Sequence, residues 1–526
     1  MKSQSKISEL TIGGKFPVQA KDFGDFVILK GPSNLAGFGR SIFEAELEFV
    51  DEVIATETEI CLAVNDQYDA QRLQELESLK FSGAQSDSST HEFGIWFSNE
   101  FDDWELICDH TWLSKEDYIS RLLGCELTIA MTGFLPGFVY LNDLPTELHV
   151  PRKTNPATWT LPSTLAIGGK YAGIYSLPSA AGWNCVGRIA ERIFDRDKLP
   201  PLSVSQGDKV KLKQIDEAAF MNSDFTSIAE KNVTCSIGGS GSLTFQKPGM
   251  LTMVQDRGRK GLAYFAIPGG GAMDFEAAEL ANVILGNTQN TAVIECHYVA
   301  PSIRFDTAAT ICLTGANMKW QIDGTKVKRN QTIEVSAESL LTGSAATKGC
   351  RAYIGIAGEI QTSTSFGSAS CYMPANFGGN GGLPFYSGDK LHWNLPAQDP
   401  VPLQLNLKSV GQDGPLDFLP GPEFDWLDDG SKKVLFTEPF QITPLSDRMG
   451  TRLAGPNLST KGKVLADSVP LLPGMIQLTP SGHCIVVLQD GQTTGGYPRI
   501  GYLNSRIVRQ LNQTRNGHPF LFRMAE

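Results

Sequence analysis

Two polar segments in the second half of the chain combine residue types that bind anions and activate water. The first, Ser446-Asp-Arg-Met-Gly450, joins an aspartate to an arginine. A guanidinium binds carboxylate or phosphate oxygens bidentately, and a carboxylate within hydrogen-bond reach takes a proton from water. In an extended segment Asp447 and Arg448 point to opposite faces, so only one reaches a shared pocket unless a turn at Gly450 intervenes. A surface loop with a local ion pair is the competing interpretation.

The second segment, Leu488-Gln-Asp-Gly-Gln-Thr-Thr-Gly-Gly-Tyr-Pro498, follows an apolar run. This order predicts a strand that ends in a polar, glycine-rich loop, where backbone N–H groups can approach a ligand closely. We expect Gln492 and Thr493 to orient that ligand. Tyr497 can stack on it or donate a hydrogen bond, or can equally pack a turn before Pro498.

Aromatic residues in the first half are candidates for the wall of a pocket. They begin with Gly133-Phe-Leu-Pro-Gly-Phe138 and include Tyr140, Tyr175 and Trp183. Packing in the core of a β-barrel is the competing interpretation, since buried aromatic rings need no ligand. Arg152 is harder to explain by packing alone, because a buried arginine needs a partner.

The composition excludes several classes of function. A formal net charge of −12 disfavours binding to nucleic acid or to an acidic membrane surface, because both need a basic face. Small molecules or proteins are the expected partners. No segment approaches the roughly 20 apolar residues that span a bilayer, and the N-terminus lacks a signal-peptide pattern, so we expect a cytoplasmic protein. The scattered ten cysteines and seven histidines predict reduced cysteines and no metal site.

Motifs that are typical of phosphate-binding loops or of a catalytic nucleophile are absent from the sequence. It contains no Walker A loop, no G-x-G-x-x-G and no G-x-S-x-G. A biotin attachment site needs a Met-Lys-Met hairpin tip, whereas Met318-Lys319 continues into Trp320. We therefore expect no covalently bound biotin.

A chain of 526 residues exceeds one hydrophobic core and predicts roughly two to four domains. Short apolar segments between Gly, Pro and Asn turns predict a mainly β protein with minor α content, built from barrels or sandwiches. A shift from charged to Gly/Ser-rich composition predicts a linker over 216–242. Helices are expected at 68–80, 115–123 and 275–285, and strands at 127–131, 302–305, 352–357 and 484–488.

Ordered motifs in the first half resemble those of a known family. They are Gly133-Phe-Leu-Pro-Gly-Phe-Val-Tyr-Leu141, Pro151-Arg152, Ala166-Ile-Gly-Gly169, Gly173-Ile-Tyr175 and Ala181-Gly-Trp183. This series is similar to the first allophanate-hydrolase-subunit family, the B subunits of 5-oxoprolinase. The sequence departs from that pattern at three places. The family's second Pro-Arg is replaced by Pro156-Ala157, its Ser-Pro-Gly-Gly-Trp by Ser179-Ala-Ala-Gly-Trp183, and its Gly-Arg-Thr by Gly187-Arg-Ile189. Loss of the second Pro-Arg removes an anion partner.

The second half carries a longer series of motifs. They are Val254-Gln-Asp256 with Gly258-Arg259, Gly271-Ala-Met-Asp274, Ala281-Asn282, Leu285-Gly-Asn287, Thr314-Gly-Ala316, Gly349-Cys-Arg-Ala-Tyr353, Leu419-Pro-Gly-Pro422, Ser446-Asp-Arg-Met-Gly450 and Gln492-Thr-Thr-Gly-Gly-Tyr-Pro498. They resemble the second allophanate-hydrolase-subunit family, the C subunits of 5-oxoprolinase. One Gly-Arg of that family is replaced by Gly382-Leu383. Both families belong to the biotin-dependent-carboxyltransferase superfamily.

The resemblance implies tandem cyclophilin-like β-barrels preceded by a small α/β domain. The small domain would span 1–90 and the barrel of the B-like half 91–215. After the linker, 243–526 would form a carboxyltransferase-family region of two β-barrel lobes.

The resemblance also implies a function, namely ATP-dependent hydrolysis of 5-oxo-L-proline to L-glutamate by a fused B/C component. The chain would need a separate A subunit, would use ATP with Mg²⁺, and could form a homo-oligomer. The residues implied in catalysis are Asp447, Arg448 and Asp490. Those implied in binding substrate or nucleotide are Gln255, Asp256, Arg257, Arg259, Asp274, Gln492, Thr493, Tyr497, Arg152, Tyr140, Tyr175 and Trp183. Which of the carboxylates activates water stays open.

Two alternatives remain at this point. One is a biotin-dependent carboxyltransferase component, similar to urea carboxylase, that acts on an amide or urea nitrogen. The missing carrier motif and the order of the two modules weigh against it. The other is a regulatory binding protein of the kinase-inhibitor type. If Arg448 binds an oxyanion, Arg448→Ala should abolish turnover with little loss of stability.

Overall fold

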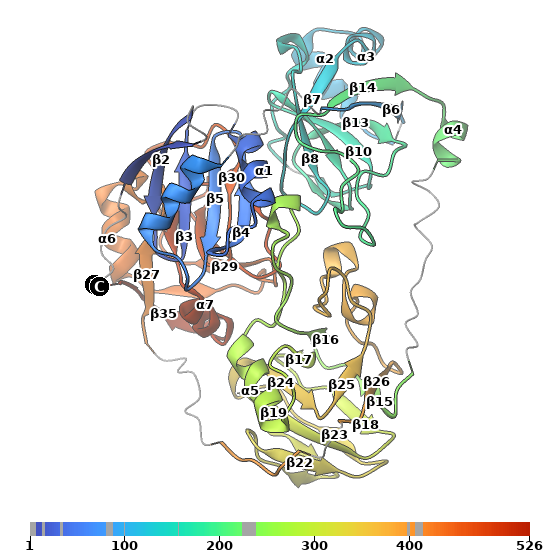
Figure 1. Ribbon diagram of the computed structural model, residues 1–526, viewed down its shortest axis with the longest axis vertical. Helices are drawn as coiled ribbons and strands as arrows, with labels where there is room; N and C mark the ends of the chain where they lie inside the picture. The colour runs from blue at the N-terminus through green and yellow to red at the C-terminus, as the bar shows by residue number, and fades with distance from the viewer. Residues whose placement is uncertain are drawn as a thin grey trace.

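The computed structural model describes residues 7–12, 16–31, 35–79, 88–98, 100–155, 157–223, 238–396, 400–405 and 414–525. This part of the chain is mainly β, with short helices between strands. It forms an N-terminal domain, a closed barrel and two further lobes (Figure 1). Within these residues no helix is long and apolar enough to cross a membrane.

The N-terminal domain is an antiparallel sheet in the order β1-β2-β3-β5-β4, with a helix on one face. Its elements are β1 (Ile7–Ile12), β2 (Phe16–Asp22), β3 (Phe26–Lys30), α1 (Ala36–Glu44), β4 (Val50–Ala55), β5 (Glu59–Val64) and the 3₁₀ helix η1 (Ala70–Ser78). Because alternate residues of a strand face opposite sides, Val27 and Leu29 pack in the core with α1, whereas Phe26 and Ile28 pack against the second half of the chain. The sheet is therefore covered on both faces.

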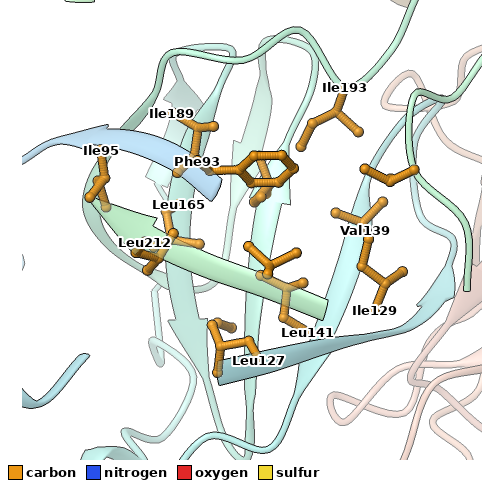
Figure 2. Close-up of a cluster of buried hydrophobic side chains, with 14 of the residues drawn as sticks. Phe93, Ile95, Leu127, Ile129, Val139, Leu141, Leu165, Ile189, Ile193 and Leu212 are labelled. Atoms are coloured by element: carbon orange, nitrogen blue, oxygen red, sulfur yellow. The ribbon is translucent and has the colours of Figure 1, made fainter. Parts of the chain in front are cut away.

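The closed barrel follows, with strands hydrogen-bonded in the order β10-β11-β8-β7-β14-β6-β13. Its elements are β6 (Thr90–Trp96), α2 (Trp104–Thr111), α3 (Lys115–Leu123), β7 (Glu126–Thr132), β8 (Val139–Asn142), η2 (Thr146–Leu148), β9 (Ala157–Thr160), β10 (Thr164–Gly168), β11 (Tyr171–Tyr175), β12 (Ser179–Ala181), β13 (Asn184–Ile189), β14 (Lys209–Gln214) and α4 (Glu217–Met221). Val139, Leu141 and Leu165 belong to the barrel interior (Figure 2). Tyr140 and Ala166, one residue away, pack in a separate core. The aromatic residues proposed for a pocket wall, Phe138, Tyr140, Tyr175 and Trp183, thus lie outside the barrel interior.

The first lobe of the second half consists of two sheets with one core between them. Their strand orders are β21-β20-β23-β18-β15-β26-β25 and β16-β17-β24-β19-β22. The elements are β15 (Gly241–Lys247), β16 (Leu251–Gln255), η4 (Ala263–Phe265), α5 (Phe275–Leu285), β17 (Val293–His297), β18 (Ser302–Phe305), β19 (Ala309–Asn317), β20 (Gln321–Ile322), β21 (Thr325–Lys326), β22 (Thr332–Val335), β23 (Leu340–Thr342), β24 (Lys348–Ile356), β25 (Glu359–Gln361), η5 (Met373–Ala375), η6 (Gly379–Gly382) and β26 (Lys390–Asn394).

The second lobe is an eight-stranded sheet in the order β35-β28-β29-β32-β31-β34-β27-β36. Its elements are β27 (Leu416–Pro420), η7 (Phe424–Trp426), α6 (Asp429–Thr437), β28 (Phe440–Ile442), β29 (Gly450–Ala454), β30 (Val469–Pro470), β31 (Met475–Leu478), β32 (Cys484–Val487), β33 (Thr494–Gly495), β34 (Arg499–Tyr502), α7 (Ser505–Asn512), β35 (Pro519–Phe520) and β36 (Phe522–Met524). The two end strands, β35 and β36, are consecutive in the chain, so the sheet almost closes into a barrel.

The N-terminal domain and the second lobe, which are far apart in the sequence, pack together. The N-terminal sheet packs on the second lobe, seen as the blue and red ribbons of Figure 1, through a core that includes Phe26, Ile28, Met475 and Tyr502. Arg499 adds a buried ionic link, because its Nη2 donates to Glu59 of β5 at 2.7 Å and to Glu423 at 2.9 Å. The B-like and C-like parts are therefore packed into one body.

Most of the predicted elements are confirmed. Helices α3 and α5 and the four strands lie where the sequence placed them, within a few residues. The segment at 68–80 is a 3₁₀ helix over Ala70–Ser78, and its buried residues Leu73 and Leu76 are spaced by one 3₁₀ turn. The predicted linker begins with helix α4, whose Phe220 packs 5.3 Å from Trp96, while residues 224–237 and Pro156 lie outside the described residues.

Candidate functional site at the junction of the two halves

The structure sorts the predicted site residues into two clusters. One lies buried between the two lobes of the second half and contains Gln255, Asp256, Arg259, Asp274, Arg448 and Asp490. The other lies where the barrel meets the second lobe and contains Tyr140, Arg152, Tyr175, Trp183, Gln492, Thr493 and Tyr497. The segment from 489 to 497 connects them. Asp447 and Arg257 belong to neither cluster, because both are exposed.

Arg448 is the centre of the buried cluster. Its Nε and Nη2 donate to the Asp490 carboxylate at 2.8 and 3.1 Å, and its Nη1 donates to Glu295 Oε1 at 2.6 Å. The Nη2 atom also donates to the carbonyl of Gly271 at 2.7 Å. Burial alone would lower the pKa of Arg448, but the two carboxylates outweigh it and hold the pKa above its usual range. Each nitrogen of this guanidinium therefore already has a partner within the protein.

Asp447 points away from this cluster, although the segment forms a turn before β29 and is not extended. Its Oδ1 accepts from the backbone N–H groups of Met449 at 2.8 Å and Gly450 at 3.0 Å. This is a carboxylate that shapes a turn. Arg257 is likewise at the surface, where it donates to Glu279 at 2.7 Å.

The other side of the buried cluster belongs to the first lobe. Asp256 accepts from the hydroxyl of Ser368 and the backbone N–H of Ala369, both at 2.7 Å. Gln255 Oε1 accepts from Ser370 Oγ at 2.5 Å. Arg259 is held by the carbonyl oxygens of Ser365 and Ser370, while its buried Nη1 has no hydrogen-bond partner within the described part of the chain.

A glycine loop lets the two lobes approach each other. The N–H of Gly270 donates to the carbonyl of Gln489 at 3.0 Å, and the N–H of Ala272 donates to the carbonyl of Asp256 at 2.9 Å. A Cβ on Gly258 would lie 2.6 Å from the Gly269 carbonyl, so that position has no room for a side chain. The two Gln-Asp segments, 255–256 and 489–490, thus meet at one loop.

Asp274 lies at the edge of this cluster. Its Oδ1 caps α5 by accepting from the N–H of Ala277, and its Oδ2 accepts from Gln513 Nε2 at 2.7 Å. Burial raises the pKa of this carboxyl. Sequence reasoning missed Glu295, although one acid inside the apolar run of β17 signals a buried charge that needs a partner.

The second cluster begins with aromatic rings on the outer face of the barrel. Phe138 contacts Tyr175 at 4.9 Å and Trp183 at 5.7 Å between ring centroids, and Tyr140 contacts Trp183 at 5.5 Å. A Cβ on Gly173 would lie 2.7 Å from both Phe138 and Trp183. The absence of a side chain there leaves room for both rings, which meet edge to face.

Arg152 differs from the expectation of a buried, partnered arginine. It is exposed, and its guanidinium lies 5.5 Å from the centroid of the Trp183 ring. In the part of the chain that the structure describes it makes no ion pair. The cation–π contact supports it from one side without neutralising it. It is therefore available to an anion.

The glycine-rich loop of the second lobe lies directly beside this arginine. A Cβ on Gly496 would be 3.3 Å from Arg152 Nη1. Thr494 Oγ1 accepts from the N–H of Phe134 at 2.8 Å, and a Cβ on Gly133 would lie 2.3 Å from that hydroxyl. Gly133 of the barrel and Gly496 of the loop therefore lie where the barrel and the loop approach each other closely, which leaves little room for a side chain.

Three parts of the chain meet at this junction. Glu57, between β4 and β5, accepts from the Tyr171 hydroxyl and from Lys170 at 3.1 Å. Asp467 of the second lobe binds the same Lys170 at 3.1 Å. These charged residues were not singled out in the sequence, because nothing in their local pattern marks them.

The loop itself offers polar groups to a ligand. Tyr497 is 40% exposed and Gln492 is partly exposed, whereas Thr493 is buried, with no hydrogen-bond partner for its hydroxyl within the described residues. The exposed groups that the loop and the barrel bring close together are therefore those of Gln492, Tyr497 and Arg152.

Magnesium has no dedicated site in the described residues, which contain no group of three or more His, Cys, Asp or Glu side chains placed to hold a metal ion. Mg²⁺ needs only one or two protein carboxylates beside the phosphates of a nucleotide.

Comparison with known proteins places this geometry in a family. The model of carboxyltransferase-domain subdomains C and D matches residues 34–204, and that of subdomains A and B matches residues 265–524. The C subunit of 5-oxoprolinase from Escherichia coli K12 is 33% identical over 278 residues, which are 52% of this chain and 89% of that protein. The B subunit of 5-oxoprolinase from E. coli O157:H7 is 31% identical over 109 residues, 21% of this chain and 50% of that protein.

Two further proteins extend the comparison. The urea amidolyase of Saccharomyces cerevisiae is 32% identical over 226 residues, 40% of this chain and 12% of that protein. The crystal structure of TTHA0988 has the same fold, with a TM-score of 0.81 at 23% identity over 95% of this chain and 99% of that one. The chain belongs to the carboxyltransferase-domain family, with its first half related to the B subunits of 5-oxoprolinase and its second half to the C subunits.

Proposed function

We propose that this protein is a fused B/C component of 5-oxoprolinase, which hydrolyses 5-oxo-L-proline to L-glutamate with ATP and a separate A subunit. The observation that carries the proposal is the junction of the two halves. There Arg152 has no ion-pair partner among the described residues and lies beside both Trp183 and the loop at Gly496. A lactam with one carboxylate matches a free guanidinium next to an aromatic face.

In the proposed complex, Arg152 binds the substrate carboxylate through two N–H groups. The exposed loop groups of Gln492 and Tyr497 hold the amide of the lactam ring, while Trp183 supports Arg152 from below. Phosphorylation of the amide oxygen by ATP makes the carbonyl carbon reactive toward water, and cleavage of the C–N bond then opens the ring. Overall, 5-oxoproline, ATP and two waters give glutamate, ADP and phosphate.

The buried cluster has a different part in this proposal. Arg448, Asp490 and Glu295 fix the lobe that presents the loop from 489 to 497, so they position the site without touching the substrate. The reactive water and the phosphoryl group need groups beyond these saturated side chains. The A subunit is the proposed source of those groups.

The test is a reconstitution. The purified chain, a cognate A subunit, ATP with Mg²⁺ and 5-oxoproline are mixed, and glutamate and ADP are measured. We expect both products in equal amounts, and none when either protein is omitted. An inactive mixture in which the chain is folded and binds the A subunit would refute the proposal.

A biotin-dependent carboxyltransferase is the second candidate, favoured by the similarity to urea amidolyase. The same preparation is then assayed with a biotin carboxylase, a biotinylated carrier, bicarbonate and urea. Bicarbonate-dependent carboxylation of urea in this mixture, without glutamate formation in the first, would establish this function instead.

A further inference from the structure

A second cavity lies between the two lobes of the second half, away from Arg152. It has a volume of about 770 Å³ and is bounded by α5, β19 and β24 of the first lobe and by α7, β27 and β36 of the second. Sites for small molecules occupy roughly 300–1,000 Å³, and they occur preferentially between domains. The size and position are those of a binding site for a molecule as large as a nucleotide.

The charges that line this cavity are unbalanced. Two of its arginines are paired with acids that also line it: Arg509 of α7 with Glu276 of α5 at 2.5 Å, and Arg523 with Asp417 at 2.5 Å. The remaining acid of the wall, Asp274, is occupied as the cap of α5 and as acceptor from Gln513.

Three cations remain on the wall after this pairing: Arg329, Lys348 and Arg506. Within the part of the chain that the structure describes, none of them makes an ion pair. They come from three separate segments, namely the connection before β22, the start of β24 and the start of α7. This concentration of positive charge is notable in a chain whose formal net charge is −12.

Arg329 is the most constrained of the three. It is half-buried, and its Nη1 donates to the carbonyl of Gly315, so the side chain is fixed at the wall. Burial lowers its pKa, with no acid nearby to oppose the effect. Keeping an unpaired cation out of water costs free energy unless an anion joins it.

We propose that this cavity binds the polyphosphate group of a small molecule, in particular a nucleoside triphosphate. A single carboxylate would neutralise only one of the three cations, whereas a chain of phosphates carries several charges and many acceptor oxygens. Guanidinium groups match phosphate oxygens in pairs, and the lysine adds a point charge. The choice of a nucleotide rests on the proposed function, since ATP is the polyphosphate which that reaction consumes.

Titration calorimetry of the full chain alone tests this proposal. ATP with Mg²⁺, inorganic tripolyphosphate and L-glutamate are the three titrants. We expect ATP and tripolyphosphate to bind, more weakly as salt is added, and glutamate to bind at least about tenfold more weakly than either. The difference in affinity between ATP and tripolyphosphate gives the contribution of the nucleoside, apart from that of the phosphates.

Variants locate the binding. Lys348 and Arg506 are exposed, so Lys348→Glu and Arg506→Glu leave the fold intact. Each is expected to weaken both phosphate ligands about tenfold or more. Lys463→Glu, an equal charge change at an exposed lysine outside the cavity, is the control and should leave binding unchanged.

Several results would overturn the proposal. They are no binding of ATP or tripolyphosphate at millimolar concentration, binding that the two cavity variants leave unchanged, or glutamate binding as tight as that of tripolyphosphate. Because no turnover is measured, an inactive mixture with the A subunit would remove the proposed function and leave this site standing.

Discussion

Arg448 and Arg152 are both arginines of family motifs, but they lie in opposite surroundings. Arg448 is 6% exposed and is enclosed by Asp490 and Glu295. Arg152 is exposed, lies over Trp183 and has no acid partner among the described residues. The charge of Arg448 is neutralised within the protein, whereas no described acid neutralises the charge of Arg152.

An arginine in a family motif can therefore either stabilise the fold or bind a ligand. Arg499, which is fully buried between Glu59 and Glu423, repeats the pattern of Arg448 at the interface with the N-terminal sheet. Both buried arginines join separate parts of the chain. Of these three arginines, only Arg152 has no acid partner among the described residues and keeps its guanidinium available for an anion.

The largest expected effect is the loss of stability when the buried arginine, Arg448, is replaced. Arg448→Met leaves the carboxylates of Asp490 and Glu295 buried without a cation, which should lower the free energy of unfolding by about 3–5 kcal/mol. Urea unfolding followed by circular dichroism measures the change. Arg257→Met is the matched control, since its ion pair with Glu279 is exposed and should contribute less than about 1 kcal/mol. An unchanged urea midpoint together with lost turnover would mean that Arg448 binds the substrate directly.

On the exposed side, Arg152→Ala should reduce kcat/KM for 5-oxoproline by about 10- to 100-fold, because a charge-assisted hydrogen bond contributes about 1.5–3 kcal/mol. The melting temperature should stay that of the wild type, since the side chain is exposed. Reconstituted turnover and thermal unfolding are the measurements. Arg152→Lys should recover part of the activity by keeping the charge. Wild-type kinetics for Arg152→Ala would remove this residue from the site.

A third prediction concerns the contact between the N-terminal domain and the second half. Glu52 accepts from the N–H groups of Gly261 at 2.7 Å and Ala263 at 2.9 Å, and burial raises its pKa to about 7. A carboxyl with a raised folded-state pKa stabilises the fold below its unfolded value, and this contribution is lost as pH rises through about 7.

Wild-type stability should therefore fall by about 1–3 kcal/mol between mildly acidic and mildly alkaline pH, relative to Glu52→Gln. The Gln variant cannot ionise, and its single amide oxygen keeps one of the two hydrogen bonds, because the NH2 group cannot accept from the other N–H. The loss of that bond lowers stability by the same amount at every pH, so only the slope of the pH profile is compared. Urea midpoints across the pH range give the difference. Parallel pH profiles for the two proteins would show that Glu52 titrates normally.

The smallest effect is expected for Asp447. Asp447→Ala removes the acceptor for the N–H groups of Met449 and Gly450. These hydrogen bonds are at the exposed surface, so stability should fall by about 1 kcal/mol or less. Turnover should remain within about threefold of the wild type, a change below 1 kcal/mol. A loss of turnover comparable to that of Arg152→Ala would place this carboxylate in the reaction.

The sequence by itself determined the local structure and much of the family. Asp274 before an apolar helical run predicts the cap of α5, and the short apolar segment at 127–131 predicts the strand β7. The glycines at 133, 173 and 496 could be recognised as unusual, since their motifs are ordered along the chain. Their reason, close contact with Thr494, Trp183 and Arg152, is visible only in three dimensions.

The tertiary structure decided which charged residues remain available. Glu295 lies 153 positions before Arg448, and Thr494 lies 360 positions after the backbone group that it binds. Local pattern cannot pair such distant residues, because the free energy of each contact depends on how the lobes pack. Whether an arginine has an acid partner depends on which carboxylates the fold places beside it. The sequence therefore indicated both Arg448 and Arg152 as site residues but could not show which of them is paired.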